Sequence, residues 1–245
     1  MAPCTKRGLD ITVDGDPVSK PYIDMTVNIM HRFGIEVARS GYTRFTVAGD
    51  QHYQPGTYTV EPDCSQAGYF WGAAAITGSA IKVKSLNPET RQGDVRLVKV
   101  LDEMGCTVSR APDGITVSGG RLKGVRVDMG DMPDMVPTLA VVAAFAKGPT
   151  VITNVAHLHG KESDRLLAVA TELRKMGIAA QCRETGIVIT GGTPQGAEIE
   201  TYNDHRIAMS FAMAGLKTPG TVIRNPGCVA KSFPDFWHVL ETLYA

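Results

Sequence analysis

Residues 165–192 read RLLAVATELRKMGIAAQCRETGIVITGG, an amphipathic stretch followed by a glycine, a short strand, a turn and a second strand. The same pattern occurs in residues 95–120 (VRLVKVLDEMGCTVSRAPDGITVSGG) and 22–50 (YIDMTVNIMHRFGIEVARSGYTRFTVAGD). The glycines that follow the amphipathic stretches, Gly34, Gly105 and Gly177, are 71 and 72 residues apart. Glycine suits this place because the residue after a helix commonly takes the left-handed conformation.

A second pattern alternates with the first at the same period. It occupies residues 63–83 (DCSQAGYFWGAAAITGSAIKV), 134–152 (DMVPTLAVVAAFAKGPTVI) and 204–223 (DHRIAMSFAMAGLKTPGTVI). These Ala-rich, almost wholly apolar segments predict helices that are buried on most sides. The helix expected from residue 165 is instead half-exposed, because its apolar residues fall on one face: Leu166, Val169, Ala170, Leu173 and Met176. The repeat unit is therefore predicted as strand, helix, strand, helix, strand and a further strand, over about 71 residues.

The phase of this repeat bears on the domain organisation. The chain begins just before the first amphipathic stretch and ends within a fourth, residues 233–245 (FPDFWHVLETLYA). We therefore expect part of a longer pattern. Residues 1–63 would be the last repeat of an otherwise missing module, and residues 64–245 would form the next.

Composition narrows the class of protein. The 245 residues are 43% hydrophobic and 20% charged, as in ordinary globular proteins. The 25 basic and 25 acidic residues balance, which argues against nucleic acid or an anionic membrane as a partner. No apolar run approaches the roughly 18–20 residues of a membrane helix. Five cysteines without CxxC spacing argue against disulfides or a zinc site, so we expect a soluble cytoplasmic protein without a metal.

Charged residues gather where helices are expected to begin. In KESDR, Lys161 and Arg165 lie four residues apart, where like charges repel and a helix N-terminus disfavours both. Either Glu162 and Asp164 neutralise them, or they bind an anion with the help of free backbone N–H groups. Lys231 is a further cation beside a helix start.

Two other clusters carry carboxylates. In YNDHR, Arg206 enters an apolar helix and needs a partner, for which Asp204 is a candidate, whereas His205 alone is weak evidence for catalysis. In DMGDMPD, one aspartate is expected to cap the following helix, and another near cations would be a candidate general base. The candidates are Asp128, Asp131 and Asp134.

These helix starts are equivalent in a repeating unit, so the repeats should aim them in the same direction. We expect a pocket for several anions, with acidic residues inside it, formed by Lys161, Arg165, Arg206, Lys231, Asp134 and Glu162. Ser19 and Tyr22, around Pro21 in a first helical turn, also suit a phosphate. No GxxxxGK[ST], GxGxxG after a strand, HExxH or GxSxG is present, which excludes nucleotide-binding, zinc-peptidase and serine-hydrolase readings.

Six motifs together resemble the 5-enolpyruvylshikimate-3-phosphate synthase family, the shikimate-pathway enzymes inhibited by glyphosate. They are VSKPYID, DCSQAGYF, DMPD, KESDR, YNDHRIAM and CVAKSFPD, in order along essentially the whole chain. The resemblance implies an α/β fold: an inverse α/β barrel-like lobe of βαβαββ repeats, the enolpyruvyl transferase fold, with part of a second lobe. Its helix N-termini would face the cleft between the lobes.

The resemblance also implies roles for residues. Contacts to shikimate 3-phosphate would come from Ser19, Tyr22, Asp134, His157 and Lys161. Asp134 would also act as the base on the attacking 5-hydroxyl. His157 stands where the family commonly has Asn, which leaves its substrate contact open.

The second substrate, phosphoenolpyruvate, would be held by Arg165, Arg206 and Lys231, while Glu162 would move a proton to or from its methylene carbon. The reaction would need no metal or organic cofactor. The catalytic Lys, Gly-rich loop and Ser-Ser-Gln segment of the family's N-terminal half do not occur in this sequence. We therefore expect a C-terminal portion with half the site, nearly inactive alone, and an N-terminal complementing segment as a candidate partner. The alternatives are a non-catalytic lobe, the complementing half of a split enzyme, or a member of the related UDP-N-acetylglucosamine enolpyruvyl transferases.

Overall fold

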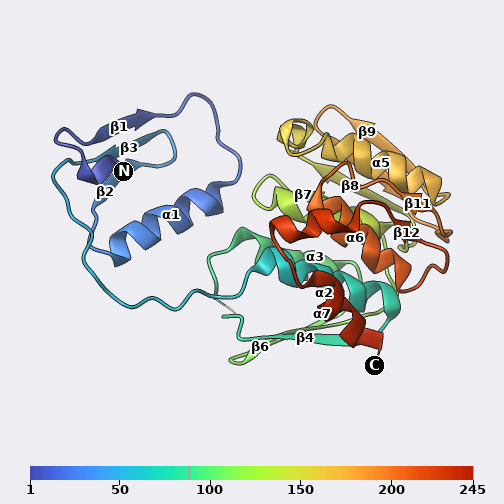
Figure 1. Cartoon of the computed structure of the whole chain (residues 1–245). Coiled ribbons are helices and arrows are strands. Elements are labelled where there is room, and N and C mark those ends of the chain that lie inside the picture. The colour runs from blue at the N-terminus through green and yellow to red at the C-terminus, as the bar shows by residue number, and fades with distance from the viewer. Residues whose placement is uncertain (88, 245) are drawn as a thin grey trace. The chain divides into compact units, whose positions relative to one another are not determined.

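The computed structural model describes residues 1–87 and 89–244, without the side chain of Tyr244, and it divides into two compact units. One unit consists of Met1–Glu61 and Glu89–Gly93, and the other of Pro62–Pro88 and Asp94–Ala245 (Figure 1). Each unit is described by itself. The assignment of residues 1–63 and 64–245 to two lobes stays a prediction.

The N-terminal unit is one copy of the helix–strand–strand pattern with an additional strand. Its elements are η1 (Ala2–Cys4), β1 (Leu9–Thr12), α1 (Lys20–Arg32), β2 (Val37–Ser40) and β3 (Arg44–Val47). The strands form an antiparallel sheet in the order β1-β3-β2. A small apolar core lies within this unit, formed by Ile35, Val37, Phe45 and Val47.

The C-terminal unit carries the remaining elements. Their order is α2 (Cys64–Thr77), β4 (Ala80–Lys84), η2 (Gly93–Arg96, whose first residue belongs to the N-terminal unit), α3 (Leu97–Glu103), β5 (Thr107–Ala111), β6 (Gly114–Ser118), β7 (Arg126–Asp128), η3 (Pro133–Met135), α4 (Val136–Ala143), β8 (Pro149–Thr153), η4 (Ala156–Gly160), α5 (Arg165–Lys175), β9 (Ala179–Arg183), β10 (Gly186–Thr190), β11 (Glu198–Ile199), α6 (His205–Gly215), β12 (Val222–Ile223), η5 (Pro226–Lys231), α7 (Phe236–Glu241) and η6 (Thr242–Tyr244).

Sheet topology confirms the internal repeat. The segment from β7 to β10 runs strand, helix, strand, helix, strand, strand, as the sequence predicts. The orders β4-β6-β5 and β8-β10-β9 match each other and the N-terminal sheet, and the registers also correspond. The matching pairs are Ile11 with Phe45, Val83 with Ile115, and Ile152 with Ile187. In addition, β11 pairs in parallel with β12, as β7 does with β8.

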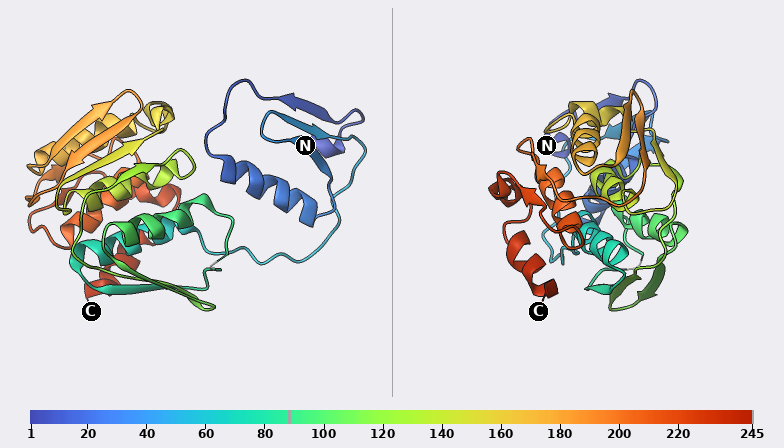
Figure 2. Two further views of the ribbon diagram at one scale, coloured as in Figure 1. Left: turned by 180° about the vertical axis from the view of Figure 1, so that it is seen from behind. Right: turned by 90° about the vertical axis from the view of Figure 1, so that its right-hand side faces the viewer.

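The three Ala-rich helices form the centre of the C-terminal unit. Helices α2, α4 and α6 pack on one another, and nearly every side chain on them is buried. Figure 2 shows the β4–β6 sheet and the β8–β10 sheet at opposite ends of this unit. Helix α5 buries the predicted apolar face, whereas Leu167 and Arg174 are exposed. No helix in the described ranges is both long and apolar enough to cross a membrane.

Aspartates begin three of these helices. Asp63, Asp164 and Asp204 are the N-cap residues of α2, α5 and α6, and each side chain accepts a backbone N–H of the first turn. The expected aspartate cap of α4 is wrong, because η3 continues directly into α4 and neither has a side-chain cap. The three candidates have other partners: Asp128 accepts from Gly130 and Asn154, Asp131 pairs with Arg96, and Asp134 pairs with two arginines.

The helix-ending glycines provide a stability prediction. Gly105 and Gly177 both have positive φ, 107° and 78°, as their position after a helix requires. A Cβ at Gly105 would lie 2.6 Å from the carbonyl oxygen of Arg121, but at Gly177 it would meet nothing within 4 Å. We expect Gly177→Ala to destabilise the protein by about 1 kcal/mol, from backbone conformation alone. Gly105→Ala should cost about 1–3 kcal/mol more, because the backbone must move as well.

Urea unfolding of the two variants, followed by tryptophan fluorescence, tests this difference. Both tryptophans, Trp71 and Trp237, lie in the C-terminal unit, as do both glycines. Equal losses of unfolding free energy would show that the clash at Arg121 has no energetic consequence.

Candidate active site

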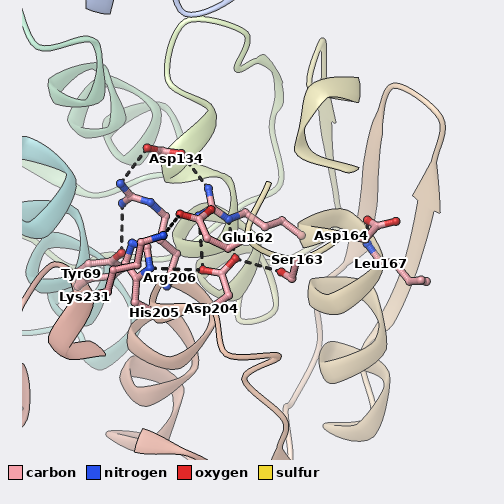
Figure 3. A network of polar contacts seen from close by, with 11 residues as sticks. Tyr69, Asp134, Glu162, Ser163, Asp164, Leu167, Asp204, His205, Arg206 and Lys231 are labelled. Atoms are coloured by element: carbon pink, nitrogen blue, oxygen red, sulfur yellow. Dashed lines mark hydrogen bonds and ion pairs between the residues drawn. The ribbon is translucent and has the colours of Figure 1, made fainter. Parts of the chain in front are cut away.

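Arg165 is the centre of a network of ion pairs, with Asp134, Glu162 and Asp204 as its partners. Figure 3 labels these three partners and the residues next to them. Arg165 is the first residue of α5, its side chain is 1% exposed, and three carboxylates surround it. Its Nε donates to Asp204 Oδ2 at 2.8 Å, its Nη1 to Asp134 Oδ1 at 2.9 Å and its Nη2 to Glu162 Oε2 at 2.5 Å. The flat guanidinium, with donors on all its edges, suits such a place.

Asp134 joins Arg165 to a second arginine. Its other oxygen, Oδ2, accepts from Arg206 Nη2 at 2.8 Å, so one carboxylate from η3 connects α5 with α6. The Arg206 Nη1 group lies 3.4 Å from the hydroxyl of Tyr69, on α2. Burial, the largest influence, raises the pKa of Tyr69 to about 12, although the charge of Arg206 lowers it. Tyr69 is therefore a neutral phenol beside a guanidinium.

Glu162 joins Arg165 to a third cation. Its Oε1 accepts from Lys231 Nζ, at the end of η5, at 2.5 Å. Burial, the largest influence, raises the pKa of Glu162, but the hydrogen bond from Lys231, a backbone N–H and the charges of Arg165 and Lys231 outweigh it and hold the pKa at about 2. Glu162 is therefore ionised at neutral pH in this state.

The predicted convergence is thus observed for five of the residues, from four elements and the loop before α5: Asp134, Glu162, Arg165, Arg206 and Lys231. Lys161, the residue before Glu162, is exposed and makes no hydrogen bond or ion pair to any described residue. Near it, His157 Nε2 is buried without a hydrogen-bond partner among the described residues. The pKa of His157 is lowered, first by burial and then by the charge of Lys161.

Ser19 and Tyr22 belong to the N-terminal unit. Ser19 is the N-cap residue of α1, with a positive φ of 60° and no side-chain cap, and Pro21 lies in the first turn as predicted. The backbone N–H of Tyr22 donates to the carbonyl of Ser19. Whether these two residues take part in the same site stays a prediction.

Two details of the expected pairing are wrong. Asp204 pairs with the guanidinium of Arg165, and only its Oδ1 accepts the backbone N–H of Arg206. The reason is that Asp204 precedes α6 and caps it, so its carboxylate faces the backbone N–H of Arg206 rather than the side chain of that residue. Lys161 also lies outside α5, in the extended residue after η4, so its expected repulsion of Arg165 along a helix does not arise.

Sequence reasoning missed two polar contributors and undervalued a third. Ser163 donates to Asp204 Oδ2 at 3.0 Å, and Tyr69 contacts Arg206. A tyrosine in an otherwise apolar helix was the available signal, since a buried hydroxyl normally needs a partner. His205 is buried beside the network, and its Nδ1 has no hydrogen-bond partner among the described residues. Burial and the charge of Arg206 lower the pKa of His205, so the ring is neutral at neutral pH.

The arrangement suits anion chemistry. Three cations converge, and each is held by a carboxylate, so an anionic ligand would find preorganised donors without reorganising the backbone. Within the described part of the chain, no group of three or more His, Cys, Asp or Glu residues has a geometry that could hold a metal ion.

The loop that carries Lys161 and Glu162 is fastened by a second pair, His159 with Asp164, at 2.8 Å. The hydrogen bond to Asp164 is the main cause that raises the pKa of His159 above its ordinary 6.5. The pKa of Asp164 is lowered from 3.8, because the Leu167 N–H and His159 outweigh burial. This pair should therefore contribute its full stabilisation between pH 3.8 and pH 6.5, the ordinary pKa values of aspartate and histidine. The contribution should be lost as pH rises through the raised pKa of His159, or falls through the lowered pKa of Asp164.

We expect His159→Gln to lower the unfolding free energy by less than about 1 kcal/mol below pH 6.5, since both side chains are more than one-third exposed. At higher pH, the variant and the original chain should become equally stable. Urea unfolding across this range measures the difference. A loss that is constant with pH would show that the pair is not ionic.

Comparison with known proteins places this geometry in a family. The model of EPSP synthase (3-phosphoshikimate 1-carboxyvinyltransferase) matches residues 1–240. Similar proteins named 3-phosphoshikimate 1-carboxyvinyltransferase include those of Nostoc punctiforme, 45% identical over 97% of this chain, and Syntrophobacter fumaroxidans, 47% identical over 99%. They are covered over 56% and 58% of their own lengths, so the chain spans about half of these relatives.

A solved structure of EPSP synthase from Acinetobacter baumannii is also similar. It is 32% identical, with a TM-score of 0.80, over 95% of this chain and 56% of the solved chain. This likeness agrees with the predicted enolpyruvyl transferase fold. The family match spans both units and every residue of the network, so the chain belongs to the EPSP synthase family.

Proposed function

We propose that this chain supplies the C-terminal part of the active site of a 3-phosphoshikimate 1-carboxyvinyltransferase. Such an enzyme transfers the enolpyruvyl group of phosphoenolpyruvate to the 5-hydroxyl of shikimate 3-phosphate. One observation carries the proposal: Arg165, Arg206 and Lys231, from three different elements, meet around the two carboxylates of Asp134 and Glu162. Cations and carboxylates in one cluster are what an anionic substrate and proton transfer both require.

Phosphoenolpyruvate would bind to the three cations. Its phosphate and carboxylate both accept bidentate hydrogen bonds, which suits the guanidiniums of Arg165 and Arg206, while Lys231 supplies a more exposed point charge. The same cations would stabilise the negative charge that grows on the phosphate as it leaves.

Shikimate 3-phosphate would lie beside them. Lys161, the residue before Glu162, is exposed without a described partner, which suits a contact to the 3-phosphate, and the uncharged imidazole of His157 suits a ring hydroxyl. Ser19 and Tyr22, at the start of α1, would contact the phosphate from the N-terminal unit. Asp134 would bind the ring hydroxyls and accept the proton of the 5-hydroxyl.

The reaction would be an addition followed by an elimination. The 5-hydroxyl oxygen bonds to C2 of phosphoenolpyruvate, its proton passes to Asp134, and C3 takes a proton, which gives a tetrahedral ketal phosphate. The C–O bond to phosphate then breaks and C3 returns a proton, which leaves the enolpyruvyl ether and inorganic phosphate. Glu162 is the group proposed to move the proton at C3, and no metal or organic cofactor is required.

The chain spans about half the length of its relatives, which favours a second candidate: a lobe that binds anions without turnover. The test is phosphate release from the two substrates, with the chain alone and with a supplied N-terminal segment of the family. Release only in the mixture supports the proposed half-site. Release by the chain alone would contradict the proposed dependence on a complementing segment. If phosphate is released in neither experiment but the chain still binds anions, the result supports the non-catalytic lobe.

A further inference from the structure

The carboxylate of Glu162 is held between two cations from different elements. Oε1 accepts from Lys231 Nζ on η5 and Oε2 from Arg165 Nη2 on α5, each at 2.5 Å (Figure 3). These are two of the three cations to which phosphoenolpyruvate is assigned above. An incoming anion therefore meets donors that Glu162 already occupies.

The charges around Glu162 are nearly balanced. Arg165 and Lys231 contact it, neutral His205 faces it from α6, and Asp134 and Asp204 share the guanidinium of Arg165. With Lys161 and Arg206 included, and with buried Asp94, whose charge acts on Arg206, four cations oppose four carboxylates, so the formal charges cancel. A phosphate carries close to two negative charges at neutral pH, and phosphoenolpyruvate carries a carboxylate in addition. Neutralising one carboxylate of the site would therefore reduce the excess of negative charge.

The ion pairs of the network differ in how easily an incoming anion could replace the carboxylate. The side chains of Lys231 and Glu162 are 55% and 29% exposed, and such pairs contribute little because water solvates both partners. Arg165 and Asp204 are 1% and 0% exposed, so breaking that pair would leave a buried charge uncompensated. Arg165 would therefore stay fixed through Nε and Nη1 while its contact with Glu162 is released.

Release of Glu162 from the two cations changes which effects determine its pKa. Burial, the largest of them, raises its pKa, and only the contacts with Lys231, Arg165 and a backbone N–H keep the pKa near 2. Once an anion takes both cations, the partial burial of Glu162 and its backbone N–H contact remain, and a neighbouring negative charge is added. The burial and the added charge both favour the protonated carboxyl, and only the backbone N–H opposes them.

We propose that an anion bound to Lys231 and Arg165 displaces Glu162 from both cations, and that the displaced carboxylate then takes up one proton from solvent. An O–H bond forms on Glu162, and the anion itself is unchanged. This rests on the proposed function, which assigns these cations to phosphoenolpyruvate and proton transfer to Glu162. The consequence is that Glu162 is protonated, and so able to act as an acid, only when an anion is bound.

Calorimetric titration in two buffers of different ionisation enthalpy counts the protons taken up per bound anion. The probes are phosphoenolpyruvate and inorganic sulfate, which has no titratable proton near neutral pH. The original chain should take up more protons than Glu162→Gln. The difference should approach one proton as pH falls below neutral, and the affinity of the original chain should rise by up to about tenfold per pH unit relative to the variant. Glu198→Gln is the matched control, because Glu198 is ion-paired with Arg224 elsewhere on this unit and should behave like the original chain.

The outcomes separate the two proposals. Binding with equal proton uptake by the original chain and Glu162→Gln overturns the exchange but leaves the assignment of the cations intact. If neither probe binds, although thermal melting shows that both variants are folded, then the assignment of the cations to an anion and the displacement of Glu162 are both overturned. Uptake that disappears in Glu162→Gln and persists in Glu198→Gln supports both.

Discussion

Replacing Arg165 with methionine is expected to lower the unfolding free energy of the C-terminal unit by about 3–5 kcal/mol. Methionine has a comparable length and helix propensity, so the loss would report the missing charge. Asp204, 0% exposed, would keep, among the described residues, only the hydroxyl of Ser163 and the N–H of Arg206 as donors. A buried carboxylate without a cation accounts for most of this cost. Urea unfolding followed by tryptophan fluorescence measures it, because both tryptophans lie in this unit.

Two further variants test whether the loss comes from the buried charge of Asp204. Lys231→Met breaks an ion pair whose lysine is 55% exposed, and it should cost less than about 1 kcal/mol. Adding Asp204→Asn to Arg165→Met removes the uncompensated charge and keeps a good N-cap, so the double variant should be more stable than Arg165→Met alone. If Arg165→Met costs no more than Lys231→Met, the buried pair does not stabilise the unit.

The sequence predicts the repeat because its signals are local. A glycine after each amphipathic stretch and a run of alanines in each central helix depend on backbone conformation and burial, which one segment determines by itself. The positive φ at Gly34, Gly105 and Gly177 and the matching strand registers confirm this. The convergence of the five charged residues was predictable for a different reason, because a repeat orients its equivalent helix starts in the same direction.

Partner choice within the site was not predictable, because it depends on distances between elements far apart in the chain. Asp204 and Arg165 are 39 residues apart, and only the packing of α5 against α6 selects this pair over Asp204 with Arg206. Glu172 illustrates the same limit. It lies in the amphipathic helix α5 but is fully buried, and its carboxylate accepts from the hydroxyl of Tyr202 and from Lys175 Nζ. From the sequence alone, a charged residue at that position is expected to face solvent, because the partners that allow its burial come from other segments.

The remaining prediction concerns the chemistry itself. Glu162→Gln is expected to lower kcat by about 10²–10⁴-fold in the complemented enzyme, because the amide cannot donate or accept the proton at C3. Affinity for phosphoenolpyruvate at neutral pH should be retained or increased, since a neutral glutamine competes less strongly for Lys231 and Arg165. Steady-state phosphate release measures turnover, and anion titration measures affinity.

The two readouts together distinguish a catalytic group from a structural one. A residue that only positions Arg165 and Lys231 would, when replaced, weaken anion binding and turnover together, whereas a proton donor should lose turnover with binding intact. Glu198→Gln, which removes an exposed charge on the same unit, should change neither quantity. If Glu162→Gln retains turnover within a few-fold of the original, the proton at C3 must come from another group. His205, buried beside Asp204 with an unpartnered Nδ1 among the described residues, would then be the next group to replace.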